Sequence, residues 1–211
     1  MFDEIVLIPA FNEYKTLRNL LKKISVKVLI INDASTDKTK KLSKNNNVEI
    51  INNSKNLGYE KSLIKGFKFI KKKYPKTKNV ITFDADGEHY PNDLTKLIRY
   101  QKKINADLII CNRKKLNRFL EKVLNYLFIF KFKIYDPLSG FKLYKFQSLK
   151  KNINRLGTDQ YLIEIINIFK KEKYIIVNFP IKCKKLINRE RRVGNFTPNY
   201  KIFYSILRNL F

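Results

Sequence analysis

The pattern with the clearest chemical meaning in this 211-residue chain is a pair of aspartates at the end of an apolar run. Residues 80–83 are expected to form a buried strand, and Asp84 and Asp86 follow it on alternate positions, with Glu88 two residues further on. Two carboxylates this close can share one hard divalent cation, and oxygen ligands with open positions are typical of Mg²⁺ or Mn²⁺ completed by substrate phosphates. The same acids could instead stabilise the start of the helix predicted after Pro91.

Two other predicted strands, at 5–8 and 28–31, also run into polar or turn residues. In an open parallel sheet the carboxyl ends of the strands meet at one edge, and ligands bind there. We therefore expect these residues to lie near the two aspartates. They are Pro9, Ala10, Asn12 and Glu13 after the first strand and Asp33 after the second.

The spacing of apolar residues predicts the elements that carry these groups. Short continuous apolar runs alternate with helical patterns through residues 1–112. This alternation is typical of an α/β fold, with a mostly parallel central sheet and helices on both faces. Strands are expected at 5–8, 28–31, 48–51, 80–83 and 108–111, and helices at about 17–24, 35–42, 59–70 and 91–98.

The second half of the chain has a different character. It is expected to contain an apolar-rich helix at 116–135, an amphipathic helix at 159–171, a strand at 174–179 that Pro180 ends, and an amphipathic helix at 200–211. No internal repeat and no long linker separates the halves, so we expect a single domain over 1–211.

The chain is strongly basic. Lys and Arg number 45 against 18 Asp and Glu, which gives a formal net charge of +27, and only 6 of the acids lie in residues 113–211. Such a surface attracts nucleic acid, anionic lipid headgroups or phosphorylated substrates. A lysine-rich composition would produce part of this charge without any partner, so charge alone leaves the partner open.

Nothing in the sequence predicts secretion or a membrane span. Acids stand where a signal peptide carries bases, and the apolar runs are far shorter than the about 20 residues of a spanning helix. Cys111 and Cys183 have no metal-ligand spacing, and we interpret them as reduced thiols of a cytoplasmic protein. His89, the single histidine, has no second His or Cys at ligand spacing, so zinc catalysis is not expected.

Several motifs across residues 4–195 occur in a known order. Residues 84–93 are similar to D-A-D-G-Q-H-x-P-E-D, with Glu88 for Gln and Asn92 for Glu. The other matches are 8–13 to P-A-Y-N-E, 31–39 to D/N-D-G-S-x-D-x-T, 56–58 with Gly66 to N-x-G…G, 136–141 to D-P-x-S-G-F and 191–194 to R-x-x-G. The chain thus resembles glycosyltransferase family 2, which has the GT-A fold, and within it the dolichyl-phosphate mannose synthases and related polyprenyl-phosphate sugar transferases.

The resemblance implies a role for each matching residue. Residues 1–112 would form the half that binds a GDP- or UDP-sugar, and 113–211 the half that binds the acceptor. Asp84, Asp86 and Glu88 would hold Mg²⁺ or Mn²⁺ on the diphosphate. The other implied contacts are Pro9, Ala10, Asn12, Glu13, Asp33 and Ala85 to the nucleotide sugar, Arg113 and Arg191 to phosphate, and Asp136, Ser139, Gly140, Phe141 and Arg192 to the acceptor.

The expected reaction depends on the acceptor. Single displacement of the diphosphate inverts the anomeric carbon, and the cation with Asp86, Arg113 and Arg191 would stabilise the departing charge. A polyprenyl phosphate is already ionised near neutral pH and needs no general base. A hydroxyl of a glycan or lipid-linked saccharide needs one, and the candidate is Asp159 or, after it, Asp136, although Asp159 could instead cap the following helix.

A lipid phosphate is the acceptor we expect, because it also accounts for the basic and aromatic second half. The segments 116–135 and 200–211 have apolar faces flanked by Lys and Arg, and could lie in the membrane interface or pack on the sheet. The prediction is an inverting, metal-dependent transferase, peripheral at the cytoplasmic face of the membrane, with or without an anchoring partner protein. A basic nucleic-acid-binding protein is favoured by charge alone, since no RRM, KH, zinc-finger or helix-turn-helix signature is present.

Overall fold

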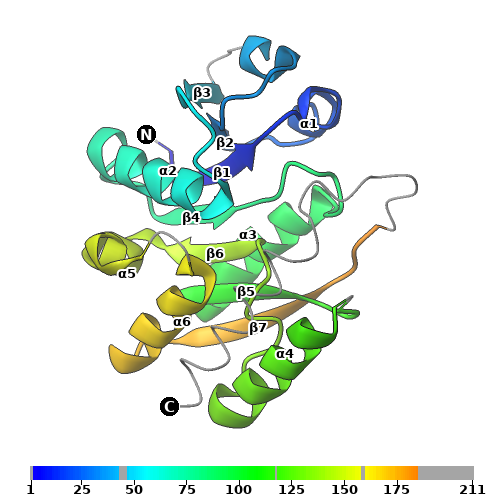
Figure 1. The fold of residues 1–211 in the computed structure, drawn as a ribbon. Coiled ribbons are helices and arrows are strands. Elements are labelled where there is room, and N and C mark those ends of the chain that lie inside the picture. The colour runs from blue at the N-terminus through cyan, green and yellow to red at the C-terminus, as the bar shows by residue number, and fades with distance from the viewer. Residues whose placement is uncertain (1, 43–46, 117, 158–159, 185–211) are drawn as a thin grey trace.

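Within the described residues, seven strands form one sheet. The protein is seen in a computed structural model that describes residues 2–42, 47–116, 118–157 and 160–184. The strands are β1 (Glu4–Ala10), β2 (Lys27–Asn32), β3 (Val48–Asn52), β4 (Asn79–Thr82), β5 (Leu108–Arg113), β6 (Lys142–Lys145) and β7 (Ile176–Ile181). Their order across the sheet is β3-β2-β1-β4-β6-β5-β7 (Figure 1).

The sheet is mostly parallel, as the sequence predicted. β1 pairs in parallel with β2 and β4, β2 with β3, and β5 with β7, whereas β6 runs antiparallel between β4 and β5. β6 was not predicted, because its four residues include a lysine at each end and no apolar run.

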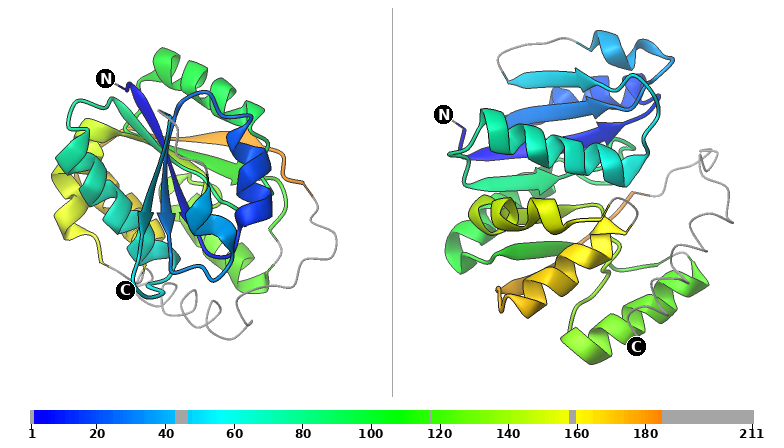
Figure 2. Two further views of the ribbon diagram at one scale, coloured as in Figure 1. Left: turned by 90° about the horizontal axis from the view of Figure 1, so that it is seen from above. Right: turned by 60° about the vertical axis from the view of Figure 1, so that its left-hand side comes forward.

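Helices cover both faces of the sheet (Figure 2). Ile5 and Leu7 of β1 point to one core cluster and Val6 and Ile8 to the other, which explains why the strand is apolar throughout. The first cluster receives α2 (Tyr59–Lys73), α4 (Phe119–Phe132), α5 (Phe146–Asn152) and α6 (Tyr161–Lys171), and the second receives α1 (Tyr14–Leu21) and α3 (Asn92–Ile104). The expected arrangement, a mostly parallel central sheet with helices on both faces, is therefore present.

Several predicted boundaries were wrong. The helix expected at 35–42 is a four-residue 3₁₀ helix, η1 (Lys38–Lys41), whose first turn is capped by the Asp37 side chain accepting from the Thr39 amide. α4 is shorter than 116–135 because Lys133, just beyond it, adopts the left-handed conformation with φ of 56°. The short α5 and the 3₁₀ turn η2 (Ile153–Arg155) were not predicted.

Pro180 does not end β7, which continues to Ile181. β7 is the last strand of the sheet, and an edge strand tolerates a residue without an amide proton. The predicted helix at 200–211 lies outside the described residues, as does the segment beginning at 185.

The antiparallel direction of β6 decides what meets at the edge where β1, β2 and β4 end. Thr82, the last residue of β4, pairs with Lys142, the first residue of β6. The loop that precedes β6, residues 136–141, therefore lies at the same edge as the segment that follows β4. Two motifs more than fifty residues apart in sequence become neighbours in this way.

No helix in the described part of the chain is long and apolar enough to cross a membrane.

Candidate active site

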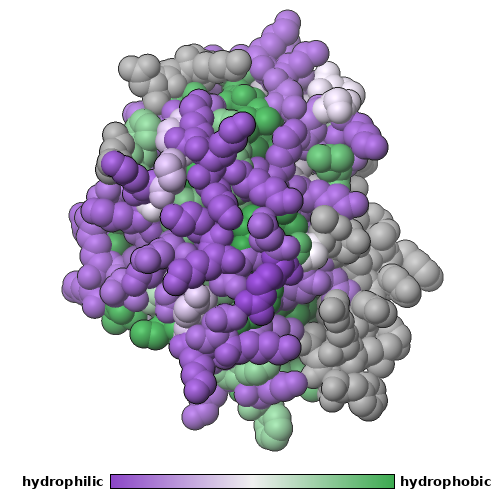
Figure 3. Space-filling view, turned by 90° about the vertical axis from the view of Figure 1, so that its left-hand side faces the viewer, coloured by the Kyte–Doolittle hydropathy of each residue, from purple (hydrophilic) through white to green (hydrophobic). Residues whose placement is uncertain are grey.

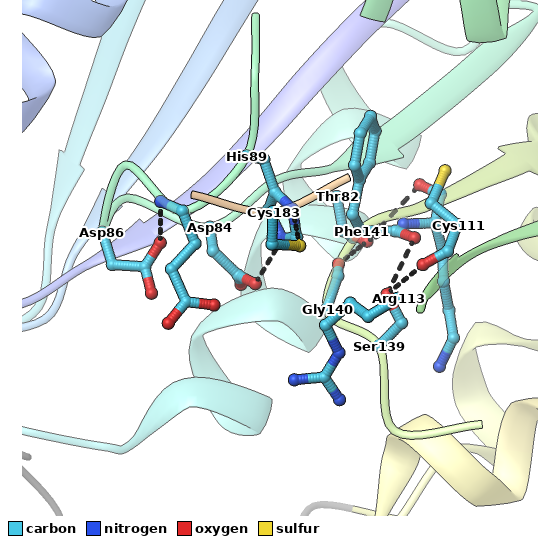
Figure 4. A network of polar contacts seen from close by, with 12 residues as sticks. Thr82, Asp84, Asp86, His89, Cys111, Arg113, Ser139, Gly140, Phe141 and Cys183 are labelled. Atoms are coloured by element: carbon cyan, nitrogen blue, oxygen red, sulfur yellow. Dashed lines mark hydrogen bonds and ion pairs between the residues drawn. The ribbon is translucent and has the colours of Figure 1, made fainter. Parts of the chain in front are cut away.

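Asp84 and Asp86 lie at the carboxyl end of β4 and are held by different groups (Figure 4). Asp84 Oδ1 accepts a hydrogen bond from the Tyr59 hydroxyl at 2.8 Å, and its Oδ2 lies 3.1 Å from Nε2 of His89. Asp86 Oδ1 accepts from the backbone amide of Glu88 at 3.0 Å. Asp84 is thus fixed by side chains from α2 and from its own loop, while a tight turn orients Asp86.

Gly140 brings the 136–141 loop against this pair. An added Cβ at Gly140 would lie 2.5 Å from Oδ1 and 2.6 Å from Oδ2 of Asp84, and would also collide with the Tyr59 hydroxyl. Thr82 holds the loop there, since its hydroxyl donates to the Gly140 carbonyl at 2.6 Å. Only glycine allows the backbone to approach the carboxylate this closely.

The charges of the two aspartates are not equivalent. Burial, together with the neighbouring charge of Asp84, raises the pKa of Asp86 to about 6. Burial also opposes ionisation of Asp84, but the hydrogen bond and charge of His89 outweigh it, with Tyr59 and Arg113 adding to the effect, so the pKa of Asp84 is lowered. The negative charge of Asp84 is therefore balanced mainly by His89. A bound cation would stabilise the negative charge of Asp86.

His89 joins the aspartate loop to the end of the described chain. It is 2% exposed, and its Nδ1 lies 3.7 Å from Sγ of Cys183, with which it forms a β-bridge. The Lys184 amide donates to the Glu88 carbonyl at 2.9 Å. Burial disfavours the charged imidazole, but Asp84 and Cys183 outweigh burial and raise the pKa of His89 to about 10. His89 is thus a charged structural link in this loop.

Asp33 lies on the same side of the molecule, and its carboxylate holds the loop between β3 and α2. It accepts from Nδ2 of Asn53 at 2.7 Å and from the amides of Leu57 and Gly58, both at 2.8 Å. Gly58 has φ of 86° and precedes Tyr59, the residue that bonds Asp84. Asp33 is therefore connected to the aspartate pair through two adjacent residues at the start of α2.

The residues after β1 form a turn beside β2. The Asn12 side chain accepts from the amides of Thr36 and Asp37, and Glu13 is buried at the start of α1. Pro9 and Ala10 are the last residues of β1 and pair with the end of β2. Ala85 is buried between the two aspartates. The residues predicted to contact the nucleotide sugar thus lie at one edge of the sheet. The hydrogen bonds of Asn12 and Asp33 shape the loops at this edge.

Arg113 and Asp136 pair with each other. Nε and Nη2 of Arg113 donate to the two carboxylate oxygens of Asp136 at 2.7 and 2.8 Å, and the Arg113 amide donates as well. Burial opposes the guanidinium charge, but Asp136 outweighs it and raises the pKa of Arg113. Asp136, which was predicted to contact the acceptor, is 2% exposed. Its two hydrogen bonds position a permanently charged arginine at the end of β5.

Ser139 and Phe141 have internal contacts. The Ser139 hydroxyl donates to the Cys111 carbonyl at 2.7 Å, and the Phe141 ring packs on Phe83 and His89. Both side chains are buried, so they support the loop that presents Gly140. Asp159, Arg191 and Arg192 lie outside the described residues.

The donor set fits a cation that keeps open positions. Among the described residues, no three Asp, Glu, His or Cys side chains form a group able to enclose a metal ion, so Glu88 is not gathered with both aspartates. Asp86 is partly exposed and desolvated, and Asp84 stands beside it. Mg²⁺ and Mn²⁺ suit one or two carboxylates completed by phosphate oxygens and water.

Sequence reasoning missed three residues that build this site. Tyr59 binds Asp84, Thr82 fixes Gly140, and Asn53 helps hold Asp33. One feature of the sequence could have indicated Tyr59: it follows Gly58 at the predicted start of a helix, and that helix begins at the edge of the sheet where the site lies. Thr82 and Asn53 had none, because their contacts depend on strand pairing.

The mostly parallel sheet with paired aspartates after β4 agrees with the GT-A fold that the sequence motifs implied. Residues 5–156 match the family described as Glycosyl transferase family 2. The chain belongs to this family.

Known proteins similar to this chain agree with that assignment. An uncharacterised protein of Methanocaldococcus jannaschii is 30% identical over 97% of this chain and 91% of its own length. The UDP-N-acetylglucosamine–dolichyl-phosphate N-acetylglucosaminyltransferase of Methanococcus voltae is 28% identical, over 98% of this chain and 96% of its own. Glucosyl-3-phosphoglycerate synthase from Mycobacterium tuberculosis, solved with Mn²⁺, UDP and phosphoglyceric acid, shares the fold with a TM-score of 0.74 and 14% identity, over 99% of this chain and 78% of that one.

Proposed function

We propose that this family 2 glycosyltransferase moves a sugar from a nucleotide diphosphate sugar to a polyprenyl phosphate, with inversion at the anomeric carbon. The observation that carries the proposal is the meeting of Asp84, Asp86 and Gly140 at the edge where β1, β2 and β4 end. The residues that follow these strands would bind the donor, as the sequence motifs imply. The mycobacterial structure of the same fold was solved with UDP, which supports a nucleotide diphosphate as part of the donor.

Asp86 is the first candidate for holding Mg²⁺ or Mn²⁺, with Asp84 beside it, whereas the Glu88 side chain is not gathered with both aspartates and its backbone amide contacts Asp86. A divalent cation bound there would stabilise the charge that develops on the departing diphosphate. Tyr59 and His89 keep the Asp84 carboxylate in one orientation, so that little reorganisation is needed when the donor binds. The Mn²⁺ in the mycobacterial structure supports a metal requirement.

Arg113 is the residue we assign to the acceptor phosphate. Asp136 fixes its guanidinium from one side, and the pair lies at the end of β5, two strands from β4. A phosphate acceptor is ionised at neutral pH and attacks without a general base, so orientation and charge neutralisation by arginine suffice. Arg191, Arg192 and Asp159 remain proposed contributors. The name of the Methanococcus voltae relative, a dolichyl-phosphate transferase, supports this acceptor class.

The outer face of α4 is the surface we propose to lie on the membrane. Phe119, Tyr126 and Phe130 are 77%, 72% and 94% exposed, and their spacing places them on one side of the helix. Exposed Lys122 and Lys133 flank them. An anionic lipid surface suits this combination of aromatic and basic side chains.

The position of α4 in the chain supports the same idea. α4 connects Arg113 to Asp136, so docking the helix would hold the Arg113–Asp136 pair close to lipid headgroups. The face formed by α2 and α5, by contrast, is largely hydrophilic (Figure 3). We propose a peripheral location at the cytoplasmic side of the membrane, with or without an anchoring partner.

The test is transfer of radiolabelled sugar into lipid. The protein is incubated with Mn²⁺, vesicles containing a polyprenyl phosphate, and a panel of UDP- and GDP-sugars, and the organic phase is counted. One donor should deliver label to the lipid, and Asp86→Asn should abolish the transfer while Asp3→Asn, a charge change at a surface ion pair, should not. Label that enters only glycan or lipid-linked saccharide hydroxyls would contradict the lipid-phosphate acceptor and favour the alternative family 2 reaction.

A further inference from the structure

Lys142 is a buried lysine beside the site, and the reaction described above does not use it. It is the first residue of β6 and is 0% exposed. Its Nζ donates to the Pro137 carbonyl at 2.8 Å and to the Leu162 carbonyl at 3.1 Å. Pro137 belongs to the 136–141 loop, and Leu162 to the first turn of α6. One side chain thus connects two segments that are twenty-five residues apart in sequence.

This connection is costly for the fold. No carboxylate forms an ion pair with Lys142 in the described part of the chain, and its Nζ donates only to neutral carbonyls. Asp136, Glu60 and Asp84 favour its charge from the loop, from α2 and from the segment after β4, whereas Arg113 of β5 opposes it. Burial outweighs these charges and lowers the pKa of Lys142 to about 7. An apolar side chain of similar length would avoid the desolvation of an amine.

The positions of the two carbonyls indicate a structural role for the lysine, because they belong to the 136–141 loop and to α6. The 136–141 loop carries Asp136, which orients Arg113, and Gly140, which lies against Asp84. Thr82 fixes the loop at Gly140 through a hydrogen bond, and Lys142 fixes it at Pro137. The second bond ties the same loop to α6, so the loop cannot shift relative to α6 without breaking a buried hydrogen bond.

We infer that Lys142 is a positioning residue for the acceptor: its amine clamps the 136–141 loop to the start of α6 and thereby fixes where Arg113 meets the acceptor phosphate. This inference rests on the proposed function. Because Lys142 and Tyr144 lie on the same face of β6, the clamp acts from within the core cluster under α5 and α6 and needs no contact with substrate.

The variant Lys142→Met keeps the length of the side chain and removes the donors, and Lys145→Met is the matched control on the same strand. Lys142→Met should raise the KM for polyprenyl phosphate about tenfold and leave the KM for the nucleotide sugar and the kcat within about twofold. The ratio of wild-type to Lys142→Met acceptor kcat/KM should fall as the pH rises from about 6 to about 8, since the buried amine loses its charge in that range. A lysine that only stabilises the fold would lower the melting temperature and leave both KM values and this ratio unchanged, which would overturn the inference.

Hydrogen exchange tests the clamp separately from catalysis. In Lys142→Met, amides of 136–141 and of the first turn of α6 should exchange faster together, while the α2 amides keep the wild-type rate. Unchanged exchange in both segments would refute the clamp, whether or not the wild-type protein transfers sugar. A wild-type protein that transfers no sugar would count only against the proposed function. If Lys142→Met does not fold, Lys142→Gln, which keeps a donor but not the charge, replaces it: the amides of 136–141 and of the first turn of α6 should exchange faster than in the wild type, and unchanged exchange in both segments would refute the clamp.

Discussion

A methyl group at position 140 should damage the cation site by displacing Asp84, although no residue that could bind the cation is itself replaced. In Gly140→Ala the new Cβ would lie 2.5 and 2.6 Å from the carboxylate oxygens of Asp84, where an ordinary contact begins at 3.4 Å. Either Asp84 or the 136–141 loop must therefore move by about 0.9 Å, the difference between these distances.

The size of the effect follows from that displacement. Misplacing a site group by about 1 Å costs on the order of 100-fold in rate, or about 2.7 kcal/mol. Overpacking costs the fold a further about 1–3 kcal/mol. We therefore expect Gly140→Ala to lower the donor kcat/KM about 100-fold, and to weaken Mn²⁺-dependent UDP binding measured by calorimetry.

Gly157→Ala provides the matched control. Its Cβ would lie 2.6 and 2.7 Å from the carboxylate oxygens of Glu164, so it introduces the same kind of clash with an acid that is not assigned to the cation. Gly157→Ala should lower the melting temperature and leave the affinity for Mn²⁺ and UDP within about twofold of wild type. If Gly140→Ala and Gly157→Ala affect UDP binding equally, the reasoning that places Gly140 against the cation ligand is refuted.

Four further outcomes are expected. Asp86→Asn should remove the rise in melting temperature that Mn²⁺ with UDP gives the wild-type protein, because the amide lacks the charge that a divalent cation requires. Replacing the exposed Phe119, Tyr126 and Phe130 together by Ser should reduce sedimentation with anionic vesicles about tenfold or more and leave the melting temperature within about 2 °C. Arg113→Lys should raise the acceptor KM, since lysine cannot reproduce the two-bond pairing with Asp136. The stability that His89 contributes should be complete below its ordinary pKa of 6.5 and lost as the pH rises through about 10, so the difference in melting temperature between wild type and His89→Gln should shrink over that interval.

Each of these outcomes has a result that would contradict it. If Mn²⁺ with UDP still raises the melting temperature of Asp86→Asn, the cation does not bind at Asp86. Vesicle binding by the α4 triple variant at the wild-type level would exclude that helix as the membrane surface. An unchanged acceptor KM in Arg113→Lys would mean that Arg113 does not bind the acceptor phosphate. A His89→Gln deficit that stays constant with pH would mean that the imidazole is neutral in the native protein.

The sequence predicted the first half of the fold well because its signals are local. Buried strands such as β1 and β2 are apolar on both faces, and the helices between them have clear one-sided patterns. Asp84 and Asp86 were placed correctly at a strand end, since the position of a strand's last residue depends mainly on its own sequence.

The antiparallel strand β6 could not be predicted in the same way. Its lysines at positions 142 and 145 disguise a buried strand, and it pairs with β4 and β5, which come much earlier in the chain. The contact of Gly140 with Asp84 follows from that pairing alone. The expectation that Asp136 would face an acceptor also missed its bidentate bond to Arg113, because nothing in the spacing shows that a left-handed residue turns its carboxylate inward.

The proposed reaction depends on one cation at the end of β4, and anomalous diffraction tests for that cation directly. Crystals grown with MnCl₂ and UDP, with data collected at the manganese edge, should give one strong peak about 2.1 Å from a carboxylate oxygen of Asp86, with the diphosphate on its open side. A manganese peak away from Asp84 and Asp86, or UDP bound at another edge of the sheet, would contradict the account.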